Sequence, residues 1–295
     1  MLYALYLAGE FFVKILPLKA CYILADILGS IYFFCAKNDK VALKENLKII
    51  LGNAAKKQDI EKYSKNVFIH FAKYLADFLK FSKINKQYLN KYVEIINSSY
   101  LDECLAKQKG IIVVTAHFGN WELGGAVIAA LGHDISAIIW EHKNKKINQL
   151  FTTRRANNNI KQIPLNQIRQ CFHVLKNNGI LGIVGDKDYT GDLGETTLFG
   201  EKIFMPKGAA VLSLKTGAPI VACFVAREKN NKLKIFFEKP IWPDEITIPS
   251  GRSEKNNAVK KIMNSCMSMF EKYIKLYPDQ WYAFEKIWKR TQITQ

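Results

Sequence analysis

Short apolar runs alternate with amphipathic segments from residue 110 onward, and this alternation constrains the fold more than any other feature. The runs have the length and composition of buried strands, and they span residues 110–116, 135–140, 179–184, 219–226 and 232–237. Helical spacing marks the intervening and final segments, at residues 122–131, 144–158, 166–178, 207–216 and 253–277. Strands that alternate with helices predict an α/β fold, with a central mixed sheet and helices on both faces.

The N-terminal part of the chain differs from this pattern. Residues 41–95 repeat apolar positions at spacings of three and four, which predicts packed helices that precede the sheet. We therefore predict a membrane-attachment segment over residues 1–40, a helical region over 41–95 and an α/β domain over 96–295. His70 lies on the apolar stripe of the helical region, and we interpret it as a packed core histidine rather than a ligand.

Two apolar segments open the chain, at residues 1–16 and 20–36, and charged residues interrupt both of them: Glu10 and Lys14 in the first, Asp26 in the second. A helix over residues 20–36 reaches about 25 Å, which is slightly short of a hydrocarbon core of about 30 Å. A surface anchor, a marginal span and a buried helical pair are the three alternatives. Membrane attachment is favoured, because the lysines that follow suit the cytoplasmic face of an anionic membrane.

The formal net charge of +17 indicates attraction to something acidic, although a lysine-rich composition also accounts for it. Nucleic acid, an anionic membrane and an acidic carrier protein are the candidates. A basic nucleic-acid-binding protein is the alternative from another functional class, and charge is its only support. The six cysteines are scattered without metal-ligand spacing, so neither a zinc site nor a disulfide framework is predicted.

The segment TAHFGNWELGG, residues 115–125, carries the strongest chemical signal. His117 follows a predicted strand, where ligands bind in open α/β sheets, and Glu122 falls in the first turn of the next helix. Across that turn a carboxylate can hold the imidazole tautomer while the free nitrogen takes a proton from a substrate hydroxyl. The spacing alone fits equally well a strand-end histidine beside an ordinary first-turn acid.

In this segment the chain resembles the H-x₄-D/E glycerolipid acyltransferase superfamily, and more closely the late acyltransferases of lipid A biosynthesis. The resemblance also rests on Thr153-Arg154, on Gly185-Asp-Lys-Asp-Tyr189 and on Pro278-Asp-Gln-Trp-Tyr282. It implies transfer of a fatty acyl chain from acyl carrier protein to a hydroxyacyl group of a Kdo-bearing lipid A precursor. Actinobacterial mannolipid acyltransferases share this branch, so another glycolipid or phospholipid is the alternative acceptor.

The resemblance further implies where this chemistry takes place and with what help. The location is the cytoplasmic face of the inner membrane, and the partners are acyl carrier protein, an anionic lipid A precursor and the membrane surface, not nucleic acid. Neither a metal nor another cofactor is implied. His117 and Glu122 form the catalytic dyad in this interpretation.

Four further residues are assigned to substrate binding. Arg154 corresponds to an arginine that can hold a phosphate or an oxyanion in a bidentate fork, with an ambiguity of one position because Arg155 follows it. Asp186 and Asp188 are expected to orient an arginine or a lysine, or to bind sugar hydroxyls. Asn120, in the turn between His117 and the helix, completes the predicted site.

Overall fold

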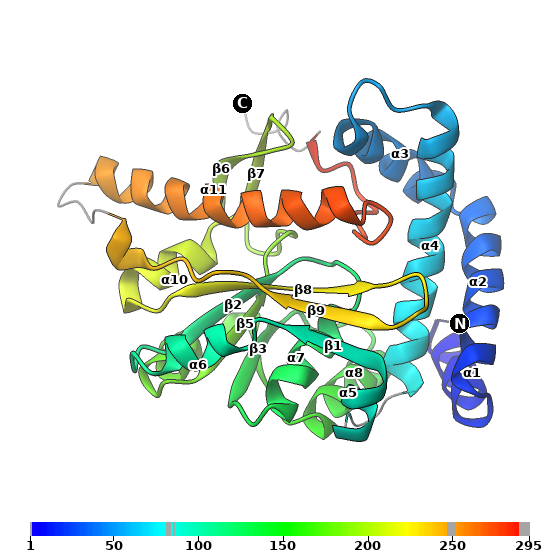
Figure 1. Cartoon of the computed structure of the whole chain (residues 1–295), viewed down its shortest axis with the longest axis horizontal. Coiled ribbons are helices and arrows are strands. Elements are labelled where there is room, and N and C mark those ends of the chain that lie inside the picture. The colour runs from blue at the N-terminus through cyan, green and yellow to red at the C-terminus, as the bar shows by residue number, and fades with distance from the viewer. Residues whose placement is uncertain (1, 81–83, 85, 247–251, 289–295) are drawn as a thin grey trace.

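The computed structural model describes residues 2–80, 84, 86–246 and 252–288. A seven-stranded sheet in the order β1-β9-β8-β2-β5-β3-β4 forms its centre (Figure 1). These strands are β1 (Val93–Ile96), β2 (Ile111–Thr115), β3 (Ile135–Ile139), β4 (Ile160–Pro164), β5 (Ile180–Val184), β8 (Ile220–Arg227) and β9 (Leu233–Phe237). β8 and β9 pair antiparallel and the other neighbours pair parallel, which confirms the predicted mixed sheet.

Helices cover both faces of this sheet, as predicted (Figure 1). One face carries α5 (Lys86–Tyr92), α6 (Ser99–Leu105), α7 (Trp121–Ala130) and α8 (Lys145–Asn157), and the other carries α9 (Arg169–Lys176), α10 (Gly208–Thr216) and α11 (Arg252–Leu276). Two single-turn 3₁₀ helices also occur, at Leu165–Gln167 and Pro243–Glu245. Because both faces are covered, the inner strands are continuous apolar runs rather than alternating ones, and every residue of β8 is buried.

The sequence pattern missed α6 and four strands, and these strands lie at the edges of the sheet or outside it. β1 and β4 are the two edges of the sheet, and β6 (Leu193–Leu198) and β7 (Glu201–Pro206) form a separate antiparallel hairpin. Edge and hairpin strands bury less than inner ones and therefore lack a long apolar run. β1 begins at Val93, inside the region predicted as helical, and residues 81–83 and 85 of that region lie outside the described part of the chain.

Four N-terminal helices stack at one end of the sheet (Figure 1): α1 (Leu2–Ile15), α2 (Leu18–Cys35), α3 (Lys37–Leu51) and α4 (Lys57–Lys80). α2 packs so closely on α4 that a Cβ on Gly29 would lie 2.7 Å from the Cα atom of Ile69. Asp26 of α2 pairs with Lys73 of α4 at 2.9 Å, which compensates the charge that interrupts this apolar segment.

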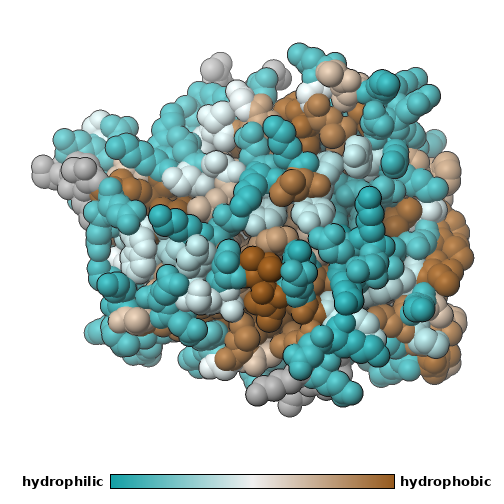
Figure 2. All heavy atoms as spheres, in the orientation of Figure 1, coloured by the Kyte–Doolittle hydropathy of each residue, from teal (hydrophilic) through white to brown (hydrophobic). Residues whose placement is uncertain are grey.

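α2 is long and apolar enough to cross a membrane by length and composition, and 28% of its residues are buried in the structure. α1 and α2 expose large apolar side chains, among them Leu5, Phe11, Phe12, Ile15, Ile23, Ile27, Ile31 and Phe34. Figure 2 shows a hydrophobic patch along the right-hand edge, where Figure 1 places these two helices. The alternative of a buried helical pair is therefore wrong, while a surface anchor and a span both remain compatible.

His70 of α4 is mostly buried, with its Nε2 3.8 Å from Oδ2 of Asp279, in keeping with the packed histidine predicted from the sequence. Burial lowers the pKa of His70 to about 4, and the negative charge of Asp279 opposes this shift only in part. The folded protein therefore holds a neutral imidazole at a pH where the unfolded chain would protonate it.

We expect the free energy of unfolding to fall between about pH 6.5 and pH 4, because over this window the unfolded chain binds a proton that the folded chain does not. The loss from this one group is on the order of 3 kcal/mol at the acid end. Urea denaturation across the window should show a smaller decrease for His70→Gln than for the wild type. Exposed His173→Gln is the matched control, and equal slopes for all three proteins would contradict the expectation.

Candidate functional site

The loop between β2 and α7 holds His117 in a fixed position just beyond the end of the sheet. Gly119 adopts a positive φ of 53°, and a Cβ there would lie 1.7 Å from the carbonyl oxygen of Val225, so only glycine fits. The backbone N–H of Gly119 donates to the carbonyl of Gln280 at 2.8 Å, and the N–H of Tyr282 donates to the carbonyl of His117 at 2.8 Å. The C-terminal segment thus holds this loop in place through backbone hydrogen bonds at His117 and at Gly119.

Asp186 is the carboxylate that contacts His117. β2 and β5 pair in parallel with Thr115 opposite Val184, so the residues that follow each strand meet at the same edge of the sheet. Nδ1 of His117 lies 2.8 Å from Oδ1 of Asp186, and the backbone N–H of His117 donates to Oδ2 at 3.0 Å. The indole N–H of Trp281 donates to the same Oδ2 at 2.8 Å, so both carboxylate oxygens are satisfied.

These contacts keep Asp186 ionised. Burial alone would raise its pKa, but the adjacent His117 and the hydrogen bonds from His117 and Trp281 outweigh burial and lower the pKa below its ordinary value. A buried carboxylate that stays negative fixes the tautomer of the imidazole and stabilises the imidazolium form. The expectation that Asp186 orients an arginine or a lysine, or binds sugar hydroxyls, is thus corrected, because both of its oxygens are engaged by His117 and Trp281.

Glu122 is engaged elsewhere. It lies in the first turn of α7 as predicted, but its carboxylate receives a two-point ion pair from Arg155 of α8, with Nε to Oε2 at 3.0 Å and Nη2 to Oε1 at 2.5 Å. The interpretation in which Glu122 holds the His117 tautomer is thus corrected, because a planar guanidinium fork matches a carboxylate better than one ring nitrogen does. His117, Glu122 and Arg155 nevertheless line one cavity.

The two neighbouring arginines of α8 have different environments. Arg154 is 6% exposed, and its guanidinium pairs with Glu10 of α1 at 3.0 Å, away from the large cavity. Burial would lower the pKa of Arg155, but the carboxylate of Glu122 raises it above its usual value, so this guanidinium stays charged at the cavity wall. Of the two arginines between which the sequence left the assignment open, Arg155 is thus the one that lines the cavity together with His117.

The other two predicted site residues have structural partners. Asp188 accepts hydrogen bonds from the backbone N–H groups of Thr190 and Gly191, which is turn chemistry. Asn120 is 3% exposed and caps α7, since its Oδ1 accepts from the N–H of Leu123 at 3.2 Å. Its amide nitrogen donates to Asp77 at 3.1 Å, so the structure uses both ends of this side chain within the protein rather than in the cavity.

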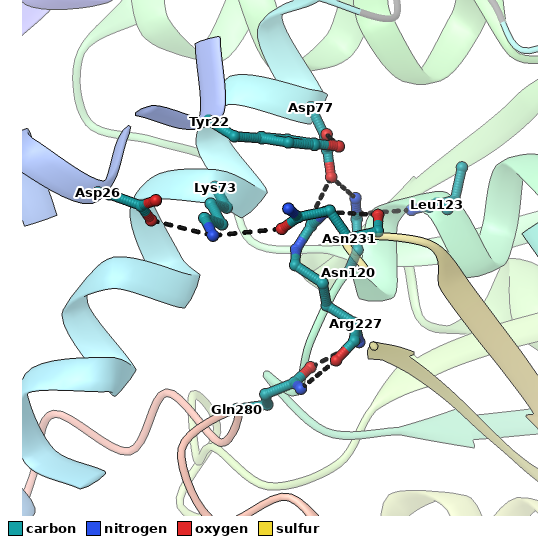
Figure 3. Close-up of polar contacts among 9 residues, drawn as sticks. All are labelled: Tyr22, Asp26, Lys73, Asp77, Asn120, Leu123, Arg227, Asn231 and Gln280. Atoms are coloured by element: carbon teal, nitrogen blue, oxygen red, sulfur yellow. Dashed lines mark hydrogen bonds and ion pairs between the residues drawn. The ribbon is translucent and has the colours of Figure 1, made fainter. Parts of the chain in front are cut away.

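A buried polar cluster beneath the His117 loop was not foreseen (Figure 3). Asp77 of α4 accepts from Tyr22 of α2 at 2.7 Å, from Asn120 of the loop and from Arg227 of β8. The side-chain amide of Gln280 in turn pairs with the backbone of Arg227, at 2.8 and 2.7 Å. Because a buried ion pair is costly to break, this cluster locks the N-terminal helices, the sheet and the C-terminal segment around one loop.

Trp281 is the site residue that sequence reasoning left out. It is 2% exposed and supplies the second donor to Asp186. The sequence did point to the Pro278–Tyr282 block, because this block supports the resemblance. It did not indicate which side chain of the block reaches the site.

A cavity of about 570 Å³ opens beside His117 and runs along the α7 face of the sheet. Most of its lining is apolar. β2, β3, β5, β8 and α7 line the part along this face, together with Phe71, Tyr74 and Leu75 of α4 and Tyr6 of α1, and Ala209 and Leu212 of α10 line a part on the opposite face. Trp140 and Tyr189 stack with ring centroids 4.9 Å apart. They also line the cavity and are 50% and 39% exposed, so they mark where it opens to solvent. Such a chamber suits a long apolar chain whose reactive end meets the histidine.

Comparison with known proteins finds acyltransferases among the relatives of this chain. The phosphatidylinositol mannoside acyltransferase of Mycobacterium tuberculosis is 24% identical over 225 residues, which is 74% of this chain and 67% of the relative. That of Mycolicibacterium smegmatis is 21% identical over 223 residues, covering 74% and 69%. The lipid A biosynthesis palmitoleoyltransferase of Escherichia coli is 24% identical over 195 residues, covering 65% of this chain and 60% of the relative.

The profile of one family, described as bacterial lipid A biosynthesis acyltransferase, matches residues 1–290. The match includes the strand-end histidine, the loop after β5 and the C-terminal segment that together build the site. The chain therefore belongs to the bacterial lipid A biosynthesis acyltransferase family and is an acyltransferase.

Proposed function

We propose that this protein moves a fatty acyl chain from acyl carrier protein to a hydroxyacyl group of a Kdo-bearing lipid A precursor, at the cytoplasmic face of the inner membrane. The observation that carries the proposal is the position of His117, oriented by a buried carboxylate and set beside a large apolar cavity. The acyl chain lies in the cavity, with its thioester carbonyl next to the imidazole.

His117 is the general base in this mechanism. Its Nδ1 faces Asp186, so Nε2 is the nitrogen left to remove the proton from the acceptor hydroxyl. The alkoxide attacks the thioester carbonyl, a C–O bond forms and the C–S bond breaks. The imidazolium, stabilised by Asp186, then returns its proton to the departing thiolate.

The Glu122–Arg155 pair has a supporting role in this proposal. It keeps a charged guanidinium at the cavity wall beside His117, where a carbonyl oxygen gains negative charge during the reaction. Arg154 acts indirectly, because its pair with Glu10 holds α8 against α1. We assign no substrate contact to Asn120 or Asp188, whose side chains are used within the protein.

A second acceptor class has specific support. Two mycobacterial relatives that cover 74% of this chain are phosphatidylinositol mannoside acyltransferases, so a mannosylated phospholipid is the alternative acceptor. Parallel assays with the lipid A precursor and with phosphatidylinositol mannoside separate the two. The nucleic-acid-binding alternative keeps only the net charge in its favour.

We expect His117→Ala to abolish acyl transfer and Asp186→Asn to lower kcat by about 10²–10⁴-fold, because an asparagine cannot stabilise the imidazolium. Asp188→Asn is the matched control, since the same change two residues away lies in a turn that asparagine also supports. Steady-state transfer from palmitoyl-acyl carrier protein measures all three variants. Near-wild-type turnover by folded His117→Ala would overturn the mechanism.

The donor prediction concerns charge. The protein has a net charge of +17, so it should attract an acidic carrier protein, and salt screens such attraction. We therefore expect kcat/KM for acyl carrier protein thioesters to fall steeply as the sodium chloride concentration rises. The same acyl group on pantetheine, which lacks the acidic protein, is the control and should depend little on salt. Equal salt dependence of the two donors would argue against acyl carrier protein.

The apolar faces of α1 and α2 should bind the membrane. The double variant Ile23→Glu, Ile27→Glu removes two exposed side chains of α2, and we expect at least roughly tenfold weaker sedimentation with phosphatidylethanolamine–phosphatidylglycerol vesicles. Asn256→Glu, Asn257→Glu adds the same charge to exposed α11 and is the control. Unchanged sedimentation of the α2 variant would place the membrane contact elsewhere.

A further inference from the structure

At the inner end of the cavity, the size of the side chains on the sheet changes abruptly between two neighbouring cross-strand rows. Furthest from His117, Ile135, Ile180 and Ile111 lie side by side in register and are 2%, 0% and 0% exposed. In the next row towards His117, Gly182 lies between Ala137 and Val113, and all three line the cavity.

The isoleucine row closes the inner end of the chamber, whereas the row with Gly182 leaves it open. Gly182 precedes Val184, the last residue of β5, by two positions. The row with Gly182 therefore lies about 7 Å inside the edge of the sheet at which His117 stands. A side chain at position 182 would therefore stand in the path of a chain that enters beside His117.

Glycine at this position needs an explanation, because a glycine inside a strand costs roughly 0.5–1 kcal/mol relative to alanine. In strands it marks a bulge, a bend or a close approach by another group. The register of β2 with β5 runs unbroken from Ile111 to Thr115, so no bulge is present. The sheet is open, with β1 and β4 at its edges, so there is no barrel corner at which β5 would have to bend, and a close approach is the explanation that remains.

The protein itself does not make that approach. The atoms nearest to a Cβ on Gly182 would belong to Ala137 and Ile135, at 3.8 Å, which is ordinary van der Waals contact. By contrast, a Cβ on Gly125 of α7 would lie 3.1 Å from Ile160, and one on Gly124 would lie 3.3 Å from Val225, so packing accounts for those glycines. The space in front of Gly182 belongs to the cavity.

We propose that Gly182 is a specificity-determining residue, which admits the distal part of a long acyl chain into the inner end of the cavity. The inference rests on the proposed function, since it takes the cavity as the acyl site. A larger side chain at position 182 would close the chamber one row earlier and leave room for short chains only.

The test is a chain-length profile of Gly182→Ala and Gly182→Val, with octanoyl-, lauroyl- and palmitoyl-acyl carrier protein as donors and the Kdo-bearing lipid A precursor as acceptor. We expect Gly182→Val to lower kcat/KM for the palmitoyl donor at least roughly tenfold relative to the octanoyl donor, with Gly182→Ala intermediate. The matched control is Ala222→Val, which enlarges a buried side chain of β8 in the core on the opposite face of the sheet. It should leave the ratio between donors unchanged.

A wild-type-like ratio in folded Gly182→Val, or an equal loss for every donor, would overturn the role of Gly182 and leave the proposed function intact. Absence of transfer by the wild type with any donor would instead overturn the proposed function. In that case, displacement of bound cis-parinaric acid by octanoic, lauric and palmitic acids decides the inference on its own. A preference shifted to short acids in Gly182→Val supports it, and an unshifted preference or no binding by the wild type overturns it.

Discussion

The site depends on one carboxylate, Asp186, at the meeting point of two parallel strands. β2 and β5 end side by side, so the residues that follow them are brought together by sheet register rather than by the loops themselves. Asp186 is buried, and such a charge is tolerated only when it is fully paired. His117 and Trp281 supply that pairing, and in doing so they join the strand edge to the C-terminal segment.

A second paired carboxylate, Asp77, supports the same loop from below. It joins α2, α4, β8 and Asn120, so the loop is held by elements from the whole length of the chain. The position of the imidazole is thus set before any substrate arrives. Catalysis of this kind depends on such preorganisation, because groups that are already aligned need not reorganise during the reaction.

The sequence alone predicted most of the fold, and it singled out His117 and Asp186 among the residues that the structure brings together. Buried strands have continuous apolar runs, so β2, β3, β5, β8 and β9 were predicted, and with them the strand-end position of His117 and the location of Asp186 after β5. The pairing of these two residues could not be predicted, because strand order is a long-range property that local periodicity does not contain. Glu122 was paired with the histidine nearest in sequence, whereas its partner Arg155 lies on α8, the next helix along the chain, which follows β3.

α1 has two opposite sides with different uses. One side contributes Tyr6 to the cavity wall and Glu10 to the ion pair with Arg154, and the other exposes Leu5, Phe11 and Phe12. Removing this apolar helix to obtain a more soluble protein would therefore also remove Tyr6 from the cavity wall. The exposed and the inward-facing residues are neighbours in the sequence, Leu5 beside Tyr6 and Phe11 beside Glu10, so a change that alters the outer face of this helix also bears on the residues next to it that contact the rest of the protein.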